Sequence, residues 1–125
     1  MPELHLGPFC VRTERTKIEA YRSAIGARRG DVPAAFPICW LGRPEIRAAI
    51  AEACAGRLPL HEGQTFDYLR PLGVEAEYRL SLTLAARPDP PRLTVHGECS
   101  TPAGELCLRM ETLLRLVEPV LEPSA

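Results

Sequence analysis

The stretch LHEGQTFDYLRPL, residues 60–72, decides the fold because the periodicity of the chain changes there. Before this stretch, apolar residues recur at helical spacing. After it, three segments alternate apolar and polar residues, as strands do. Helical segments followed by an antiparallel sheet leave only a few fold types open. We therefore expect an α+β architecture for this chain.

The clearest strand is predicted in residues 75–84, where every second residue is apolar. One face of it carries Ala76, Tyr78, Leu80, Leu82 and Leu84, while charged and hydroxyl side chains occupy most of the other face. Residues 92–99 and 105–117 repeat the alternation, and a turn rich in proline or glycine precedes each of them. This pattern is typical of an antiparallel sheet with one buried face. Residues 118–125 contain two prolines and are expected to form a loose tail.

The first part of the chain combines a strand with a helix. Residues 5–11 alternate loosely and predict a first strand. Thr16 and Glu19 have the spacing of a capping box, in which each side chain satisfies an unpaired backbone N–H. We therefore expect a helix that begins at Thr16 and stops at Gly26.

A second helical region follows. Residues 34–41 are apolar on all sides of a helix and should be buried. Pro44 then suits the first position of a helix, because its missing N–H is not needed there, and Gly56 ends the helical pattern. We expect an apolar helix from this region to cover the apolar face of the sheet.

The composition limits the partners and the location of the protein. The chain has 125 residues, about the size of one domain, and we expect residues 1–125 to form a single domain. The formal net charge is -1, from 15 basic and 16 acidic residues, so no long-range field favours nucleic acid or an anionic membrane. No apolar run reaches the roughly 20 residues of a transmembrane helix. Five cysteines without a Cys-x-x-Cys pair indicate reduced thiols in a cytoplasmic protein, with no metal site.

Three segments resemble the family of MaoC-like hydratases and dehydratases. Residues 16–26, TKIEAYRSAIG, are similar to its opening helix, and residues 35–37, AFP, to its Ala-Pro-Pro segment. Residues 61–72, HEGQTFDYLRPL, are similar to a strand of the family's N-terminal, fatty-acid-synthase-like dehydratase half. The resemblance implies a hotdog fold, in which a curved antiparallel sheet wraps around an apolar helix.

The resemblance also implies a reaction and a type of partner. Members of the family add water reversibly to 2-enoyl thioesters of coenzyme A or acyl carrier protein. They form homodimers or heterodimers with a second hotdog subunit, and no cofactor is implied. An Asp and a His in a D-x-N-P-x-H loop move the protons, because water must lose a proton while the α-carbon gains one.

The present chain departs from that loop. Its residues 26–33 read GARRGDVP, so Ala27 stands at the position of the Asp, and no His occurs between His5 and His61. In two-part members of the family, the N-terminal half shapes the acyl tunnel and the other half supplies the catalytic pair. The chain is therefore interpreted as a partner subunit or a degenerate member; if active, it would be a 3-hydroxyacyl-thioester dehydratase. A non-catalytic acyl-thioester-binding or scaffold protein and a hotdog thioesterase remain open as alternatives.

Catalysis and acyl binding each have two candidate residues. Asp31 is either a shifted catalytic carboxylate or an ordinary carboxylate in a Gly-Asp turn. His61 is either a proton shuttle or a histidine that makes a structural hydrogen bond where its strand begins. Phe36 and Trp40 either line an acyl pocket or belong to the core.

Three arginines are candidates for binding the phosphates of coenzyme A or of a carrier protein. A guanidinium group matches phosphate geometry, which favours Arg28 and Arg29 for this role. Surface solvation is the alternative for both. Arg70 either binds the same phosphates or pairs with Asp67 or Glu62.

Overall fold

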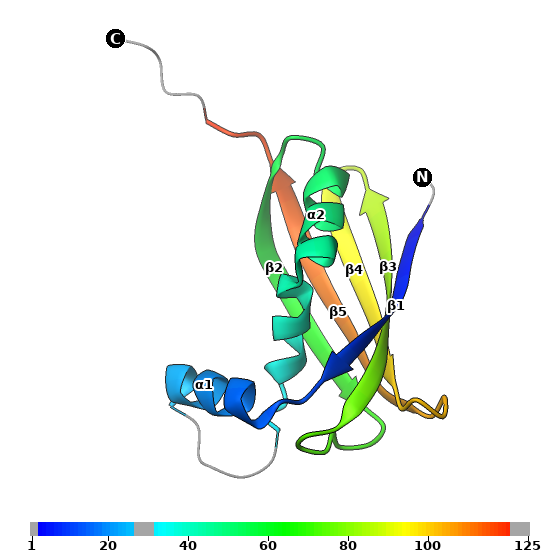
Figure 1. The fold of residues 1–125 in the computed structure, drawn as a ribbon. Helices are drawn as coiled ribbons and strands as arrows, with labels where there is room; N and C mark the ends of the chain where they lie inside the picture. Colours follow the sequence, from blue (N-terminus) through cyan, green and yellow to red (C-terminus); the bar gives the residue numbers. More distant parts are fainter. Residues whose placement is uncertain (1–2, 27–31, 121–125) are drawn as a thin grey trace.

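The computed structural model describes residues 3–26 and 32–120, which form a five-stranded antiparallel sheet with helices against one face (Figure 1). In chain order the elements are β1 (Leu4–Arg12), α1 (Arg15–Ile25), the 3₁₀ helix η1 (Phe36–Gly42), α2 (Pro44–Ala53), β2 (Leu58–Tyr68), β3 (Glu77–Arg87), β4 (Arg92–Ser100) and β5 (Leu106–Val117). The predicted α+β order of a strand, helices and four further strands is confirmed. Arg28, Arg29 and Asp31 lie outside the described residues.

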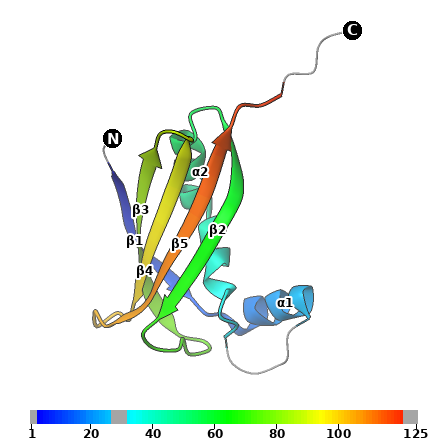
Figure 2. The same cartoon turned by 180° about the vertical axis from the view of Figure 1, so that it is seen from behind.

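The strand order in the sheet is β1-β3-β4-β5-β2, with all neighbouring strands antiparallel. Strand β2 therefore lies at one edge, beside β5, although it precedes β3 in the chain. Seen from the front and from behind, the sheet curves around the helical layer (Figures 1 and 2). In the part of the chain that the structure describes, no helix is long and apolar enough to cross a membrane.

The predicted alternation of buried and exposed residues is present in β3, β4 and β5. Leu80, Leu82 and Leu84 of β3 are 0%, 2% and 2% exposed, and the residues between them are exposed or half-buried. Gly97 of β4 leaves room on the same face, because a Cβ atom there would lie only 2.9 Å from Cγ of Met110. The apolar face of the sheet is thus close-packed, as protein interiors are.

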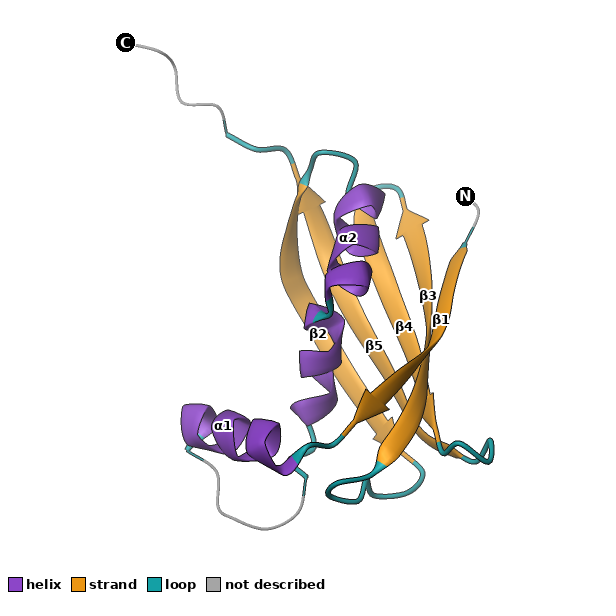
Figure 3. Ribbon diagram, in the orientation of Figure 1, coloured by secondary structure: helices purple, strands orange, loops and turns teal. Residues whose placement is uncertain are grey.

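The helices η1 and α2 follow one another across this face of the sheet (Figure 3). Phe36 and Trp40 of η1 and Ile46 of α2 are 2%, 7% and 0% exposed. The prediction that the whole segment around η1 is buried is wrong at Ala34 and Cys39, which are exposed. A helix that lies on one face of a sheet turns its opposite side to the solvent, whatever the composition of that side.

Both α-helices end close to glycines, as their sequences predict. At the end of α1, Gly26 adopts a left-handed conformation with φ 70°, and its N–H bonds to a carbonyl of the last turn. Helix α2 starts at Pro44, as predicted. It ends at Ala53, before Gly56, because Ala55 already adopts a left-handed φ of 52°.

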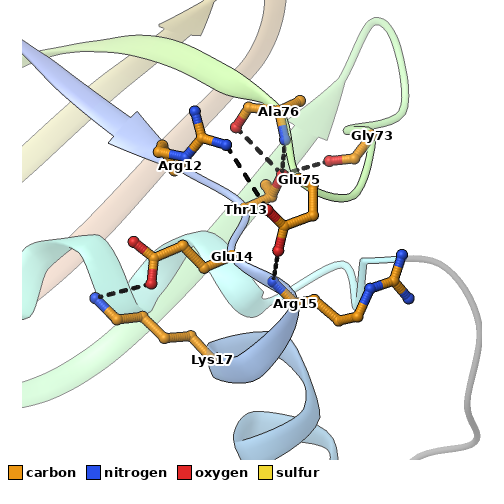
Figure 4. Close-up of polar contacts among 8 residues, drawn as sticks. All are labelled: Arg12, Thr13, Glu14, Arg15, Lys17, Gly73, Glu75 and Ala76. Atoms are coloured by element: carbon orange, nitrogen blue, oxygen red, sulfur yellow. Dashed lines mark hydrogen bonds and ion pairs between the residues drawn. The ribbon is translucent and has the colours of Figure 1, made fainter.

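Helix α1 stands away from the sheet, and its N-terminus is capped from another part of the chain (Figures 1 and 4). It begins at Arg15, and the predicted capping box is wrong because Glu19 pairs with Arg22 at 2.8 Å instead of turning back to Thr16. The carboxylate of Glu75 accepts a hydrogen bond of 2.6 Å from the backbone N–H of Arg15. A negative charge at this position complements the helix dipole.

A buried threonine fastens the start of α1 to the loop before β3 (Figure 4). The hydroxyl of Thr13 donates to the carbonyl of Gly73 at 2.5 Å and accepts from the N–H of Ala76 at 2.9 Å. The N–H of Glu75 donates to the carbonyl of Thr13 at 2.7 Å and holds Glu75 at a left-handed φ of 56°. We call these four residues the Thr13 clasp. Because Thr13 is 0% exposed, its polar atoms depend on these bonds.

Candidate functional site

Helix α1, η1 and the β2–β3 loop lie at one end of the sheet (Figure 1). Residues of these segments line two cavities. The aromatic cavity, of about 580 Å³, is lined by Cys10, Val11, Arg12, Glu14, Lys17, Ala20, Tyr21, Phe36, Cys39, Trp40 and Arg43. The loop cavity, of about 610 Å³, is lined by Val32, Ala34, Tyr68, Leu69, Arg70, Pro71, Leu72 and Gly73. Among the residues that the structure describes, none lines both cavities.

The floor of the aromatic cavity is a row of three rings packed edge to face. The rings of Tyr21 and Phe36 are 5.8 Å apart at 89°, and those of Phe36 and Trp40 are 6.2 Å apart at 84°. The indole N–H of Trp40 donates to the carbonyl of Arg12 at 3.3 Å. Edge-to-face packing and this hydrogen bond fix the rings, so the floor is apolar and already formed.

Three cations from three different segments line the same cavity. Arg12 ends β1, Lys17 lies on α1 and Arg43 precedes α2, whereas Glu14 is the only carboxylate among the described lining residues. The sequence analysis missed this group because its members are far apart in the chain and form no motif. Only the fold brings them to one opening.

The loop cavity is built mainly from the continuous stretch 68–73, opposite Val32 and Ala34. The hydroxyl of Tyr68 donates to the carbonyl of Ala34 at 2.6 Å. Burial raises the pKa of Tyr68 to about 12, and the nearby Cys99 adds to the effect. The phenol is therefore neutral at physiological pH and acts as a hydrogen-bond donor.

Arg70 lines the loop cavity, but its ion-pair partner differs from the predicted ones. It pairs with Glu105 rather than with Asp67 or Glu62. Glu62 pairs instead with Arg92 at 2.7 Å. The reason is that the backbone N–H groups of residues 69 and 70 both bond to the carbonyl of residue 107, which turns the chain towards the start of β5.

Phe36 and Trp40 belong to the buried core and also line the aromatic cavity. A place in the core and a place in a pocket wall therefore do not exclude each other for these two residues. Of the residues predicted near the missing catalytic loop, Arg28, Arg29 and Asp31 lie outside the described residues. Val32, which follows them in the chain, lines the loop cavity.

His61 lies on β2, away from both cavities. It is exposed, and its ring makes no hydrogen bond within residues 3–26 and 32–120. Tyr68 is seven positions further along the chain, which corresponds to about 23 Å along a strand at roughly 3.3 Å per residue. The structure therefore does not bring His61 next to Val32 or Ala34.

No metal site is found among the described residues, and raised pKa values make two of the cysteine thiols less reactive. No group of three His, Cys, Asp or Glu side chains is placed to hold a metal ion there. All five cysteines are free. A hydrogen bond to Glu77 raises the pKa of Cys10, and burial raises that of Cys99 to about 12, which disfavours the nucleophilic thiolate at both positions.

No family model and no curated protein sequence matches the chain. Several solved structures do. One chain of the HadBC (3R-hydroxyacyl-ACP dehydratase) complex of Mycobacterium tuberculosis is 13% identical to this chain. The match covers 86% of this chain and 91% of the HadBC chain, with a TM-score of 0.71. The chain has a hotdog fold. The resemblance to MaoC-like hydratases noted in the sequence is thereby confirmed at the level of the fold.

Other proteins with this fold differ in activity. The (R)-hydratase of A. caviae involved in PHA biosynthesis is 18% identical, with 92% of this chain and 94% of that chain covered and a TM-score of 0.56. A probable thioesterase from Bartonella henselae is 10% identical, with 98% and 96% covered and a TM-score of 0.58. Hydratases and thioesterases thus share this fold, and the lining residues have to distinguish between the two reactions.

Proposed function

We propose that this protein binds acyl thioesters of fatty-acid metabolism as the non-catalytic subunit of a hotdog hydratase or dehydratase. The observation that carries the proposal is the lining of the loop cavity. Among its described residues, the only ionisable side chains are Arg70 and Tyr68, whose neutral phenol is bonded to Ala34. Such a cavity suits an acyl chain and one phosphate, and none of its described lining residues is a base that could activate water.

The free edge of β2 supports a partner subunit. Strand β2 pairs only with β5, and Leu58 and Leu60 on it are 51% and 53% exposed. Open strand edges offer a template for pairing with another chain. Both edge strands contain a proline and a register shift, between Leu6 and Phe9 in β1 and between His61 and Gly63 in β2. The edge of β2 is favoured because it has two exposed leucines, whereas the described part of β1 has one, Leu4. We therefore expect a second hotdog subunit at β2, either a second copy or a different chain.

The proposed reaction divides its tasks between the two subunits. The oxygen of water forms a bond to C3 of a 2-enoyl thioester, a base takes one proton of the water, and an acid delivers a proton to C2. The partner subunit would supply this base and acid. The loop cavity would hold the acyl chain, and Arg70 would contact a phosphate of the carrier. A cytoplasmic location fits this role because all five cysteines are free thiols.

The alternatives have less support. A thioesterase needs a group that activates water at the thioester, and the only carboxylate among the described lining residues of both cavities, Glu14, pairs with Lys17 at 3.7 Å. A pure binding or scaffold protein would bind acyl thioesters without turnover in any mixture. Asp31 and His61 remain the predicted residues for a relocated catalytic pair.

The test is hydration of crotonyl-coenzyme A by the purified chain, alone and mixed with a hotdog subunit that has an intact D-x-N-P-x-H loop. We expect weak binding and no hydration by the lone chain, and hydration on mixing, because general acid–base catalysis contributes about 10²–10⁴-fold in rate. Robust hydration by the lone chain that is lost in Asp31→Asn or His61→Ala would overturn the proposal. Release of free thiol by the lone chain would establish the thioesterase reading instead.

A further inference from the structure

The aromatic cavity plays no part in the proposed acyl-thioester site. None of its described lining residues also lines the loop cavity, and it lies beside β1, at the edge of the sheet opposite to β2. We propose that the aromatic cavity is a separate binding site for a small amphipathic carboxylate, namely the anion of a medium-chain fatty acid. This site does not depend on the function proposed above.

The floor of the cavity suits an aliphatic chain. Its volume of about 580 Å³ lies within the range of about 300–1,000 Å³ that is usual for small-molecule sites. Phe36, Trp40 and Val11 are 2%, 7% and 3% exposed, so their positions are set by the core. Because this apolar surface is already formed, binding an apolar chain does not incur the entropic cost of ordering the protein side chains. Ala20 also lines the cavity, and its side chain is small.

The opening of the cavity suits an anion. Arg12, Lys17 and Arg43 outnumber the single carboxylate of Glu14 among its lining residues. Lys17 pairs with Glu14 at 3.7 Å, with the two side chains 70% and 42% exposed. Arg12 pairs with Glu75, also at 3.7 Å, with both side chains nearly half exposed. Long, exposed ion pairs contribute little stability, so an arriving carboxylate can replace them at small cost.

Arg43 is the best-fixed of the three cations. Its guanidinium donates to the carboxylate of Glu45 at 2.8 Å and to the backbone carbonyl of Cys10, and it lies 5.5 Å from the centre of the Phe9 ring. A guanidinium held in this way loses little side-chain freedom when it binds a further carboxylate. Arg43 therefore provides a fixed charge at the opening, while Lys17 provides a movable one.

Trp40 makes the site easy to observe, because it is the only tryptophan of the chain and forms part of the floor. We expect decanoate to change the fluorescence of Trp40 in a saturable way. Decanol should bind at least tenfold more weakly, and decyltrimethylammonium should bind more weakly still because the cations repel it. Equal binding of decanoate and decyltrimethylammonium, or no saturable response to decanoate, would overturn the proposal.

Two matched substitutions on α1 locate the site. Ala20 lines the cavity and Ala24 does not, and both are exposed. Ala20→Phe should fill the cavity and weaken decanoate binding at least tenfold by calorimetry, whereas Ala24→Phe should leave it unchanged. Lys17→Met should weaken the binding of decanoate severalfold and leave that of decanol unchanged. Equal effects of Ala20→Phe and Ala24→Phe would contradict the location.

A further variant separates this proposal from the acyl-thioester site. Ala34 is exposed and lines only the loop cavity. Ala34→Phe should leave the Trp40 response to decanoate intact. Loss of that response in Ala34→Phe would show that the two cavities form one site, which contradicts the proposal. If acyl-coenzyme A fails to bind while decanoate still binds the unaltered chain, only the proposed acyl-thioester function is refuted.

Discussion

The two cavities lie at the same end of the molecule but are built in different ways. The loop cavity takes most of its lining from the continuous stretch 68–73, which belongs to the family-like motif. The aromatic cavity combines side chains from β1, α1 and η1, which only the fold brings together. A site formed by one continuous segment can therefore be recognised from its sequence motif. A site formed by segments that are distant in the chain has to be found in the three-dimensional structure.

Both cavities depend on the core of the sheet, and Leu80→Asp should abolish them together. Leu80 is 0% exposed and lies between Phe9 of β1 and Cys99 of β4. An unpaired buried carboxylate costs several kcal/mol, which is of the order of the stability of a whole domain. Circular dichroism and urea unfolding should show an unfolded chain.

Ser81→Asp is the matched control for this substitution, because Ser81 is the exposed neighbour on the same strand. It should leave the unfolding midpoint nearly unchanged. A folded Leu80→Asp variant with an unaltered melting temperature would refute the assignment of the buried face.

A charge on the β2 edge should affect subunit pairing and leave both cavities intact, because the first residues of β2 line neither of them. The unaltered protein should have at least twice the mass of 13.8 kDa by light scattering, and Leu60→Lys should reduce it to the monomer because the charge opposes strand pairing. Leu4→Lys places the same charge on β1, where Leu4 is 48% exposed, and should leave the mass unchanged. An identical effect of the two variants would refute β2 as the pairing edge.

The Thr13 clasp connects the walls of the two cavities, because it joins the start of α1 to Gly73 of the loop cavity. Thr13→Val keeps the shape of the side chain but leaves buried backbone groups without their hydroxyl partner. We expect a loss of about 1–3 kcal/mol in the free energy of unfolding and faster amide exchange in α1. Thr16→Val, on the exposed side of α1, should cost much less, because no capping box exists.

The same clasp shows why the sequence analysis of α1 was only partly right. Gly26 predicts the end of the helix from local chemistry, and this prediction is confirmed. The start of the helix is set by Glu75, whose place in the chain is 60 residues further on. Local helix propensity cannot predict an N-terminal cap that is supplied by a residue distant in the chain.

More of the sheet than of the candidate site could be predicted from the sequence. In β3, β4 and β5 most buried residues alternate with more exposed ones, with Thr94 and Cys107 as buried exceptions, so the alternation reveals the strands. Arg70 is different, because its partner Glu105 depends on how the chain leaves β2. The cations Arg12, Lys17 and Arg43 carry no signal in the sequence, since each reads as an ordinary surface charge until the fold places them around one opening.

The smallest expected effect is that of Tyr68→Phe on the stability of the fold at alkaline pH. Burial raises the pKa of Tyr68 to about 12 from the ordinary value of 10.0. The stabilisation by the neutral phenol is therefore complete below about pH 10 and is lost as the pH rises towards about 12, because the unfolded chain loses this proton first.

In Tyr68→Phe, the urea midpoint should fall less between about pH 10 and pH 12. At pH 7 the variant should lose only the hydrogen bond to Ala34, about 1 kcal/mol. An identical alkaline decline in both proteins would assign it to other groups, such as Cys99.

The proposed function requires that the loop cavity, and not the aromatic cavity, receives the acyl thioester. The most direct test is calorimetric titration of the Ala34→Phe and Ala20→Phe variants with hexanoyl-coenzyme A, in the presence of the partner subunit. We predict that Ala34→Phe weakens binding at least tenfold and that Ala20→Phe leaves it unchanged. Loss of binding in Ala20→Phe with full binding in Ala34→Phe would contradict the account.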